Sequence, residues 1–402
     1  MTTRESRSVS NRTSRGFPIT AWSTVNSLGT TTEQVMSALR SGRASLSPPP
    51  SETPFETICG VVDDGLAALP ERLKQLDSRN NRFVQKALSE IDASLNAARD
   101  RWGAERIGIC VGSSTAAMDE IESVYATHAE TGAIPSGFDV YARGSFDGLL
   151  RALRGLTGLE GPAAVVSNAC ASSGKAFASA KRWIDAGAVD AVLVGGADCL
   201  CQITLRGFRS LGLLSCEPTR PFSSERRGIN IGEGAAFALI ERSGEGPRLL
   251  GAGESGDAHH MTTPDPEGRG AQSAMEAAIS DAGVLATDID YINAHGTGTA
   301  FNDAMESRAI RAALGTAADP IVVSTKGYVG HTLGAAGAVE AVFVLESLGN
   351  GWIPASVGAE PLDPEIGLNV TTAPVEIDVR LALSNSFAFG GSNVSLVFGA
   401  PE

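Results

Sequence analysis

The feature that most constrains this chain is a repeated alternation of short β-branched runs with Ala-rich stretches of helical length. Strands that alternate with helices of this kind form mainly parallel sheets covered by helices. The sequence therefore predicts an α/β fold. The predicted strands are 106–111, 163–167, 189–195, 235–240, 321–324 and 394–398. The predicted helices are 33–41, 83–99, 172–186, 270–281, 304–314 and 334–348.

Composition narrows the class of protein. With 402 residues, of which 43% are hydrophobic, the chain can bury a large core and has room for two or three domains. It contains no apolar run long enough to cross a membrane, and its basic, Ser/Thr-rich start lacks the apolar stretch of a secretory signal. A net charge of −14 argues against nucleic-acid binding. We therefore expect a cytoplasmic enzyme without a membrane or nucleic-acid partner.

The polar, Gly-containing segment 240–247 is the predicted internal boundary, because it follows one strand-like run and precedes another. It separates a half at 17–243 from a half at 244–402, and residues 1–16 are expected to form a flexible tail. The six cysteines include no CxxC pair and no zinc-ligand spacing, so a disulfide scaffold or zinc site is not predicted.

One cysteine stands at a position suited to chemistry. Cys170 lies in NACASSG (168–174), between a strand-like run and an Ala-rich helix. A thiol at a helix N-terminus lies in the positive end of the helix dipole, which favours the thiolate. Small neighbours leave room for a substrate. From spacing alone, a buried structural cysteine explains Cys170 equally well.

Two of the five histidines lie in Gly-rich segments. His295 is part of NAHGTGT (293–299), and His331 is part of KGYVGHTLGAAG (326–337). Each is expected at a junction between a strand or helix and a loop, where a side chain faces a cleft. A lone histidine is more often structural, but two of them with a cysteine at a helix start predict a Cys-His-His site.

These three motifs, together with SNSFAFGGSN (384–393), resemble the β-ketoacyl-acyl-carrier-protein synthases of the type I/II condensing group. The resemblance covers residues 19–398, with the motifs in the family's order. It implies the thiolase-like fold, in which two duplicated α/β halves form a five-layered α-β-α-β-α sandwich. It also implies a homodimer, with a heterodimer with a related subunit as the alternative.

The resemblance implies decarboxylative Claisen condensation of an acyl chain with malonyl-acyl-carrier protein. Cys170 matches the nucleophile that takes the acyl chain from a carrier-protein thioester. His295 and His331 match the pair that stabilises the enolate formed when malonyl loses carbon dioxide, and N–H donors aimed at such an oxygen lower the barrier. Lys326 matches the lysine that fixes the environment of the histidines, and Glu340 matches its ion-pair partner.

Further roles follow from the same resemblance. The backbone N–H groups of Cys170 and Phe389 would form the oxyanion hole, with Phe389 also gating the acyl pocket. The enzyme needs no cofactor, because the carrier protein brings the phosphopantetheine, which Thr297 and Thr299 would bind. The other implied positions are Arg79 and Arg82 for carrier-protein docking, where a solvated helix start is the competing interpretation, and Asn293, Glu340, Ser384 and Asn385 for a structural monovalent cation.

The chain also departs from the family pattern. Ala388 replaces a glycine between two phenylalanines, Ile229 replaces an aromatic residue beside the acyl pocket, and Arg227 replaces an acid. Gly298 stands where many relatives have serine. These changes predict a reshaped acyl pocket and a specialised polyketide or aryl-polyene product rather than housekeeping fatty-acid elongation.

Two other functions were weighed against condensation. A chain-length-factor-like partner subunit shares the fold but lacks the nucleophile, whereas Cys170 and both histidines are present here. A coenzyme-A thiolase would carry a second reactive cysteine near the C-terminus, and the segment 384–398 contains none.

Overall fold

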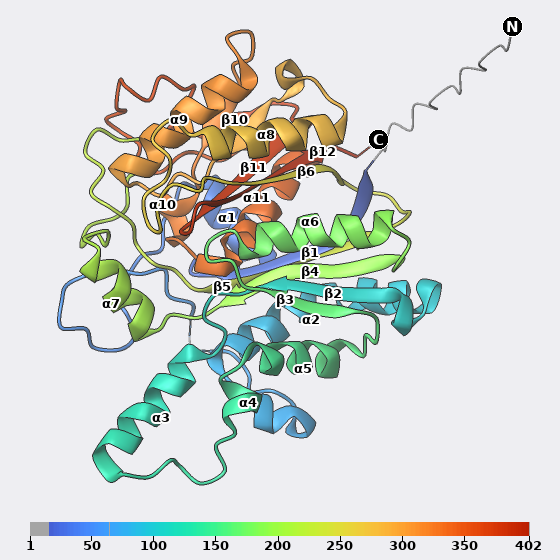
Figure 1. Ribbon diagram of the computed structural model, residues 1–402. Coiled ribbons are helices and arrows are strands. Elements are labelled where there is room, and N and C mark those ends of the chain that lie inside the picture. The colour runs from blue at the N-terminus through green and yellow to red at the C-terminus, as the bar shows by residue number, and fades with distance from the viewer. Residues whose placement is uncertain (1–15, 64, 402) are drawn as a thin grey trace, which may run out of the picture.

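The computed structural model describes residues 16–63 and 65–401, so the predicted tail lies, apart from Gly16, outside the described residues. The strands form one continuous ten-stranded sheet, whose two five-stranded halves, the first and the second sheet, lie one above the other (Figure 1). They meet where β1 and β6 pair over two residues, Phe17 with Leu249 and Pro18 with Arg248. The strands are β1 Phe17–Asn26, β2 Ile107–Gly112, β3 Ala163–Val166, β4 Ala191–Asp198, β5 Gly234–Glu241, β6 Arg248–Gly256, β7 Tyr291–Asn293, β8 Ile321–Val323, β11 Leu381–Ala388 and β12 Ser392–Gly399, with β9 Trp352–Ile353 and β10 Val375–Glu376 as a separate small pair.

The two sheets have the same topology. The first runs β3-β2-β4-β5-β1 and the second β8-β7-β11-β12-β6, so each follows the order third, second, fourth, fifth, first strand of its half. In both sheets the first two of these pairings are parallel and the last two antiparallel. The duplication implied by the resemblance is therefore present in the fold. The expectation of mainly parallel strands is wrong for the middle of the molecule.

Helices complete five layers, as Figure 1 shows. The long helix α2 and helix α5 cover the outer face of the first sheet, α6 and α11 lie between the sheets, and α8 and α9 cover the second. The helices are α1 Thr32–Arg40, α2 Arg79–Trp102, α3 Met118–Thr131, α4 Val140–Arg143, α5 Phe146–Thr157, α6 Ser172–Asp185, α7 Gln202–Ser210, α8 Arg269–Ala282, α9 Ala300–Leu314, α10 Lys326–Val329 and α11 Ala336–Asn350.

The predicted five-layered sandwich is thus confirmed, and each predicted strand and helix exists within a few residues of its expected ends. The predicted division after residue 243 falls in the connection between β5 and β6, and it stays a prediction. Residues 384–393 form most of a hairpin between β11 and β12, with a turn at Phe389–Gly391. No helix among the described residues is long and apolar enough to span a membrane.

The two central helices approach each other closely at glycines. A Cβ added to Gly337 on α11 would lie 2.8 Å from the backbone nitrogen of Gly174 on α6 and 2.9 Å from Ser386 Oγ. Beside this contact, the Ala338 N–H donates a hydrogen bond of 2.9 Å to Ser173 Oγ. The N-terminal turns of α6 and α11 therefore meet at the centre of the molecule, where the functional residues gather.

We expect Gly337→Ala to shift the urea-unfolding midpoint downward, by about 1–3 kcal/mol in the free energy of unfolding, because the methyl group has no space. Gly349→Ala, near the other end of α11, is the matched control. A Cβ at Gly349 meets nothing within 4 Å, so alanine's higher helix propensity should leave stability equal or raise it by about 0.5–1 kcal/mol. Equal behaviour of the two variants would contradict the proposed close contact.

Candidate active site

Cys170 lies in a sharp turn between β3 and α6. The residue before it, Ala169, has a φ of 44°, in the left-handed region that non-glycine residues rarely adopt. The start of α6 packs tightly against β2, because a Cβ at Gly112 would lie 2.1 Å from the Ser173 nitrogen. The turn presents the buried Cys170 thiol to a pocket, and the backbone N–H groups of Cys170 and Phe389 act to lower the pKa of this thiol.

The thiol is not held as a thiolate in the substrate-free protein. Burial raises the pKa of Cys170 to about 11, although the charge of Lys326 and the two N–H groups act in the opposite direction. The expectation that the helix dipole would favour the thiolate is therefore outweighed by desolvation. The sulfur must lose its proton as it attacks.

The two histidines face Cys170 from the second half of the chain. His295 follows β7 and His331 follows α10, and their rings meet edge-on with centroids 5.3 Å apart and an interplanar angle of 84°. A ligand atom from each histidine and the Cys170 sulfur all lie within 4.8 Å of one another. These three residues could together bind a metal ion. They fit equally well a nucleophilic thiol with two hydrogen-bond donors around one reacting carbonyl group.

Both histidines are neutral. Burial lowers the pKa of His295 and of His331 well below the usual range, and the nearby charge of Lys326 lowers both further. Within the described chain, both ring nitrogens of His331 and Nδ1 of His295 have no hydrogen-bond partner. Neutral imidazoles with free nitrogens can each offer one N–H to a substrate oxygen.

Lys326 and Glu340 form a buried ion pair behind the pocket. Nζ of Lys326 lies 2.5 Å from Oε1 of Glu340, and both side chains are almost fully buried. Burial raises the pKa of Glu340, and the ammonium group of Lys326 opposes this rise. The structure thus places together the pair that the sequence predicted, outside the pocket lining and close enough to act on the pKa values of the thiol and both histidines.

Two acids on α9 hold the histidine loop, and sequence reasoning missed both. Glu306 accepts hydrogen bonds from the backbone N–H groups of His295 at 2.8 Å and Gly296 at 2.7 Å. Burial raises the pKa of Glu306 to about 7. Asp303 accepts from the backbone N–H groups of Phe222 and Gly298. The available signal was their spacing of eight and eleven residues after His295, which puts both on one helix facing the loop.

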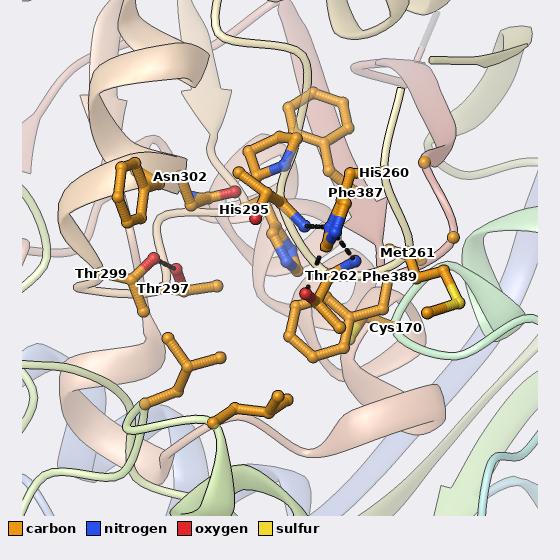
Figure 2. Close-up of a pocket in the computed structure, with 18 of the residues that line it drawn as sticks. Cys170, His260, Met261, Thr262, His295, Thr297, Thr299, Asn302, Phe387 and Phe389 are labelled. Carbon is orange, nitrogen blue, oxygen red and sulfur yellow. Dashed lines mark hydrogen bonds between the residues drawn. The ribbon is translucent and has the colours of Figure 1, made fainter. Parts of the chain in front are cut away.

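The pocket itself collects the remaining predicted substrate residues. Thr297 and Thr299 line it with hydroxyl oxygens 2.9 Å apart, and Ile229 and Phe389 line its apolar part. Figure 2 shows Cys170, His295 and the two threonines around one space. The empty space is about 940 Å³, including open solvent at the mouth.

Other lining residues were not predicted. Phe208 on α7 packs against Phe389, with ring centroids 5.5 Å apart. The segment from His260 to Pro264 forms one wall, where Nδ1 of His260 accepts hydrogen bonds from the backbone N–H groups of Thr262 and Thr263 (Figure 2). The Gly390 N–H donates to the Met261 carbonyl at 2.7 Å, which joins this wall to the Phe389 turn.

Of the four predicted cation residues, two are paired across neighbouring strands. Ser384 and Asn293 are paired on β11 and β7, and both are buried. Asn385 is already engaged, donating to Glu306 and accepting from Ser395. Glu340 Oε2 and Asn293 Nδ2 have no partner among the described residues. A buried, unpartnered carboxylate oxygen suits a monovalent cation, so this site stays a prediction.

The predicted docking arginines are engaged in ion pairs. Arg79 binds the fully buried Glu233 at 2.5 Å and also donates to the Val62 carbonyl, and Arg82 binds Asp77 at 2.5 Å. These contacts anchor the start of α2 to the rest of the fold. Both guanidinium groups are thus engaged in ion pairs, and the docking role that the resemblance implies for them stays a prediction.

The pKa of Cys170 gives a direct prediction for the protein without substrate. Since only the thiolate reacts with iodoacetamide, labelling of Cys170 should accelerate about tenfold per pH unit from about pH 7 to about pH 9, with no plateau. Peptide mass spectrometry would separate Cys170 from the exposed Cys216, which reports on the reagent. A labelling rate already constant above about pH 7 would mean that the thiol is activated in the free protein.

Comparison with known proteins agrees with this geometry. Residues 18–245 match the family model "Beta-ketoacyl synthase, N-terminal domain" and residues 248–360 match "Beta-ketoacyl synthase, C-terminal domain". The chain is 34% identical to nodulation protein E of Rhizobium meliloti (strain 1021), over 96% of this chain and 99% of that protein. It is 32% identical to 3-oxoacyl-[acyl-carrier-protein] synthase 2 of Vibrio harveyi, over 96% and 98%.

Solved structures give the same picture. A ketosynthase (ApeO) in complex with its chain length factor (ApeC) from Xenorhabdus doucetiae superimposes with a TM-score of 0.89 at 37% identity, covering 96% of this chain and 98% of that one. The ishigamide ketosynthase/chain length factor gives a TM-score of 0.88 at 29% identity, covering 96% and 99%. The chain therefore belongs to the β-ketoacyl synthase family.

Proposed function

We propose that this protein is a 3-oxoacyl-[acyl-carrier-protein] synthase, an acyltransferase that condenses an acyl chain held on Cys170 with malonyl-acyl-carrier protein. The observation that carries the proposal is the grouping of Cys170, His295 and His331 within 4.8 Å at the base of one pocket. A chain-length-factor-like subunit would not need this intact group. A thiolase is disfavoured because no second cysteine lines the pocket.

In the first half-reaction, the Cys170 sulfur attacks the thioester carbonyl of the acyl-carrier protein. A new S–C bond forms, the old C–S bond breaks, and the pantetheine thiol leaves with the proton that the Cys170 thiol loses. The N–H groups of Cys170 and Phe389, which point at the sulfur, are placed to bind the oxyanion of the tetrahedral intermediate.

In the second half-reaction, His295 and His331 donate N–H groups to the thioester oxygen of the malonyl unit. The bond to the carboxylate breaks, carbon dioxide leaves, and the electron pair forms an enolate stabilised by the two donors. The enolate carbon attacks the acyl group on Cys170, and the C–S bond breaks to give the β-ketoacyl-carrier protein and the Cys170 thiolate, which takes up a proton from solvent water. The neutrality of both imidazoles supports this role, because an N–H donor is needed rather than an acid.

The acyl substrate is proposed to be specialised. Ile229, where the family usually has an aromatic residue, lies buried at the pocket and leaves more room beside Cys170 for a bulky or conjugated chain. A polyketide or aryl-polyene product is the corresponding pathway. No cofactor is required, since phosphopantetheine arrives on the carrier protein and passes Thr297 and Thr299. Cytoplasmic localisation stays a prediction.

The carrier protein would dock at the rim of the pocket. Large apolar side chains are exposed there, with Met261 at 77% and Phe301 at 70% exposure. Arg209, which follows Phe208 on α7, is exposed and lies over the Phe55 ring. Apolar contacts with a cation beside them suit an acidic carrier protein. Arg79 and Arg82, which the resemblance matches to docking positions, remain proposed as part of the docking site.

A second thiolase-fold subunit is the other proposed partner. The edge strand β3 is only half-buried, and α3 has no fully buried side chain while exposing Tyr125. The expected assembly is a homodimer, and a heterodimer with a related chain-length-factor subunit is the alternative. Native mass spectrometry of the chain alone and with such a subunit separates the two.

The half-reactions should separate by residue. Cys170→Ala removes the atom that holds the acyl chain, so acyl-enzyme formation and condensation should vanish while carbon dioxide release from malonyl-carrier protein persists. His331→Ala keeps the thiol and the oxyanion hole but loses one enolate donor, so decarboxylation should fall roughly a hundredfold or more. Intact-protein mass and carbon dioxide release from labelled malonyl substrate measure the two steps.

Both variants must first show wild-type thermal unfolding, because a disrupted loop would mimic either loss. Acylation of the Cys170→Ala protein, or normal decarboxylation by His331→Ala, would show that the roles are misassigned.

Docking has its own test. Arg209→Glu should lower kcat/KM for carrier-bound acyl substrates by about tenfold at low salt and less at high salt, while acyl-pantetheine is used normally. The matched control is Arg151→Glu, an exposed arginine on α5 in a different layer. An equal loss with both substrate types would place the effect of Arg209 in folding.

A further inference from the structure

Helix α7 begins without a cap of its own. The side chain of its N-cap residue, Cys201, makes no capping hydrogen bond, although the Thr204 hydroxyl donates to the Cys201 carbonyl and meets the Cys201 thiol. The first N–H groups of any helix lack partners within the helix. A carboxylate from another element fills this gap. Glu122 on α3 accepts from the Gln202 N–H at 2.7 Å through Oε2 and from the Ile203 N–H at 2.6 Å through Oε1.

These are charge-assisted bonds at the positive end of a helix dipole, where a carboxylate is favoured. The other acids of α3 do not contact α7 in this way. Asp119 accepts from the Cys199 thiol, Glu120 pairs with Arg143, and Glu130 is exposed. Glu122 is therefore the residue through which α3 holds the start of α7.

Helix α7 reaches the oxyanion hole six residues later. The ring of Phe208 packs against the ring of Phe389, and both Phe389 and Cys170 line the pocket, where the backbone N–H of Phe389 acts to lower the pKa of the Cys170 thiol. The other side of the same turn is fixed by the Gly390–Met261 hydrogen bond. The turn that carries the oxyanion donor thus lies between a backbone contact on one side and α7 on the other.

We propose that Glu122 is a positioning residue for acyl transfer: its two hydrogen bonds to the start of α7 set the place of Phe208, and Phe208 sets the place of the Phe389 N–H. The inference rests on the proposed function, because it concerns the first half-reaction. It does not involve the histidine pair, of which His295 is held by Glu306 from α9 and His331 donates its backbone N–H to the Asn230 carbonyl. Loss of Glu122 should therefore slow acylation of Cys170 and leave malonyl decarboxylation intact.

The test measures single-turnover acylation of Cys170 by intact-protein mass spectrometry, alongside carbon dioxide release from malonyl-carrier protein. Glu122→Gln retains one acceptor and loses the other together with the charge, and it should slow acylation about tenfold with unchanged decarboxylation. Glu130→Gln, an exposed acid on the same helix, is the matched control and should change neither rate.

A second variant covers the case in which Glu122→Gln fails to fold. Gln202→Pro removes one of the two N–H donors from the first position of α7, where proline is tolerated. The preceding Cys201 already has an extended backbone, with φ −145° and ψ 155°, as a residue before proline prefers. It should show the same selective loss of acylation.

A double-mutant cycle separates positioning from general loosening. If Glu122 acts through Phe208, the Glu122→Gln/Phe208→Leu protein should acylate no more slowly than the slower single variant. The inference would be overturned if the double variant lost acylation rate by the product of the two single losses. Wild-type acylation by Glu122→Gln, or an equal loss of both half-reactions in that variant, would overturn it as well. Absence of acylation in the wild-type chain would instead overturn the proposed function.

Discussion

A single buried cation organises the electrostatics of this protein. Lys326 is buried with one carboxylate partner, Glu340, and its charge acts on three groups of the pocket at once. Burial is the main cause of the low pKa of both histidines, and Lys326 lowers this pKa further. The same charge opposes the rise in the pKa of Cys170 that burial causes. Breaking a buried pair leaves an uncompensated charge, so the site and the stability of the core around it depend on the same interaction.

The architecture was largely readable from the sequence because apolar runs and Ala-rich stretches report burial directly. The order of strands was not. The residues of 235–240 have the composition of a buried parallel strand, yet β5 pairs antiparallel with both neighbours. A strand buried on both faces shows no alternation, so composition does not reveal its direction. The internal duplication was likewise invisible as a repeat, since topology is shared while side chains have diverged.

The site residues also fall into two groups, those that the local sequence predicted and those that it did not. Cys170, His295, His331 and Lys326 carry recognisable local sequence, and the fold brings them together from positions up to 161 residues apart. Glu306, Asp303 and Glu122 act through backbone N–H groups of distant segments, and no local pattern records which backbone a carboxylate will meet. The partner of Arg79, Glu233, lies 154 residues away along the chain, so this ion pair was equally invisible in the local sequence.

The matching topology of the two sheets has a consequence for how the enzyme can be divided. In each half, the central helix follows the third strand, and the two helix N-termini meet at Gly174 and Gly337. The first half brings the acyl-bearing sulfur to this meeting point and the second brings both imidazoles. Each half is thus a module for one partner of the new carbon–carbon bond, and neither is a complete catalyst. Chimeras that join halves of two relatives would combine the thiol of one parent with the histidines of the other, provided that the close contact at Gly174 and Gly337 is preserved. Their acyl pocket would be mixed, because Ile229 comes from one half and Phe389 from the other.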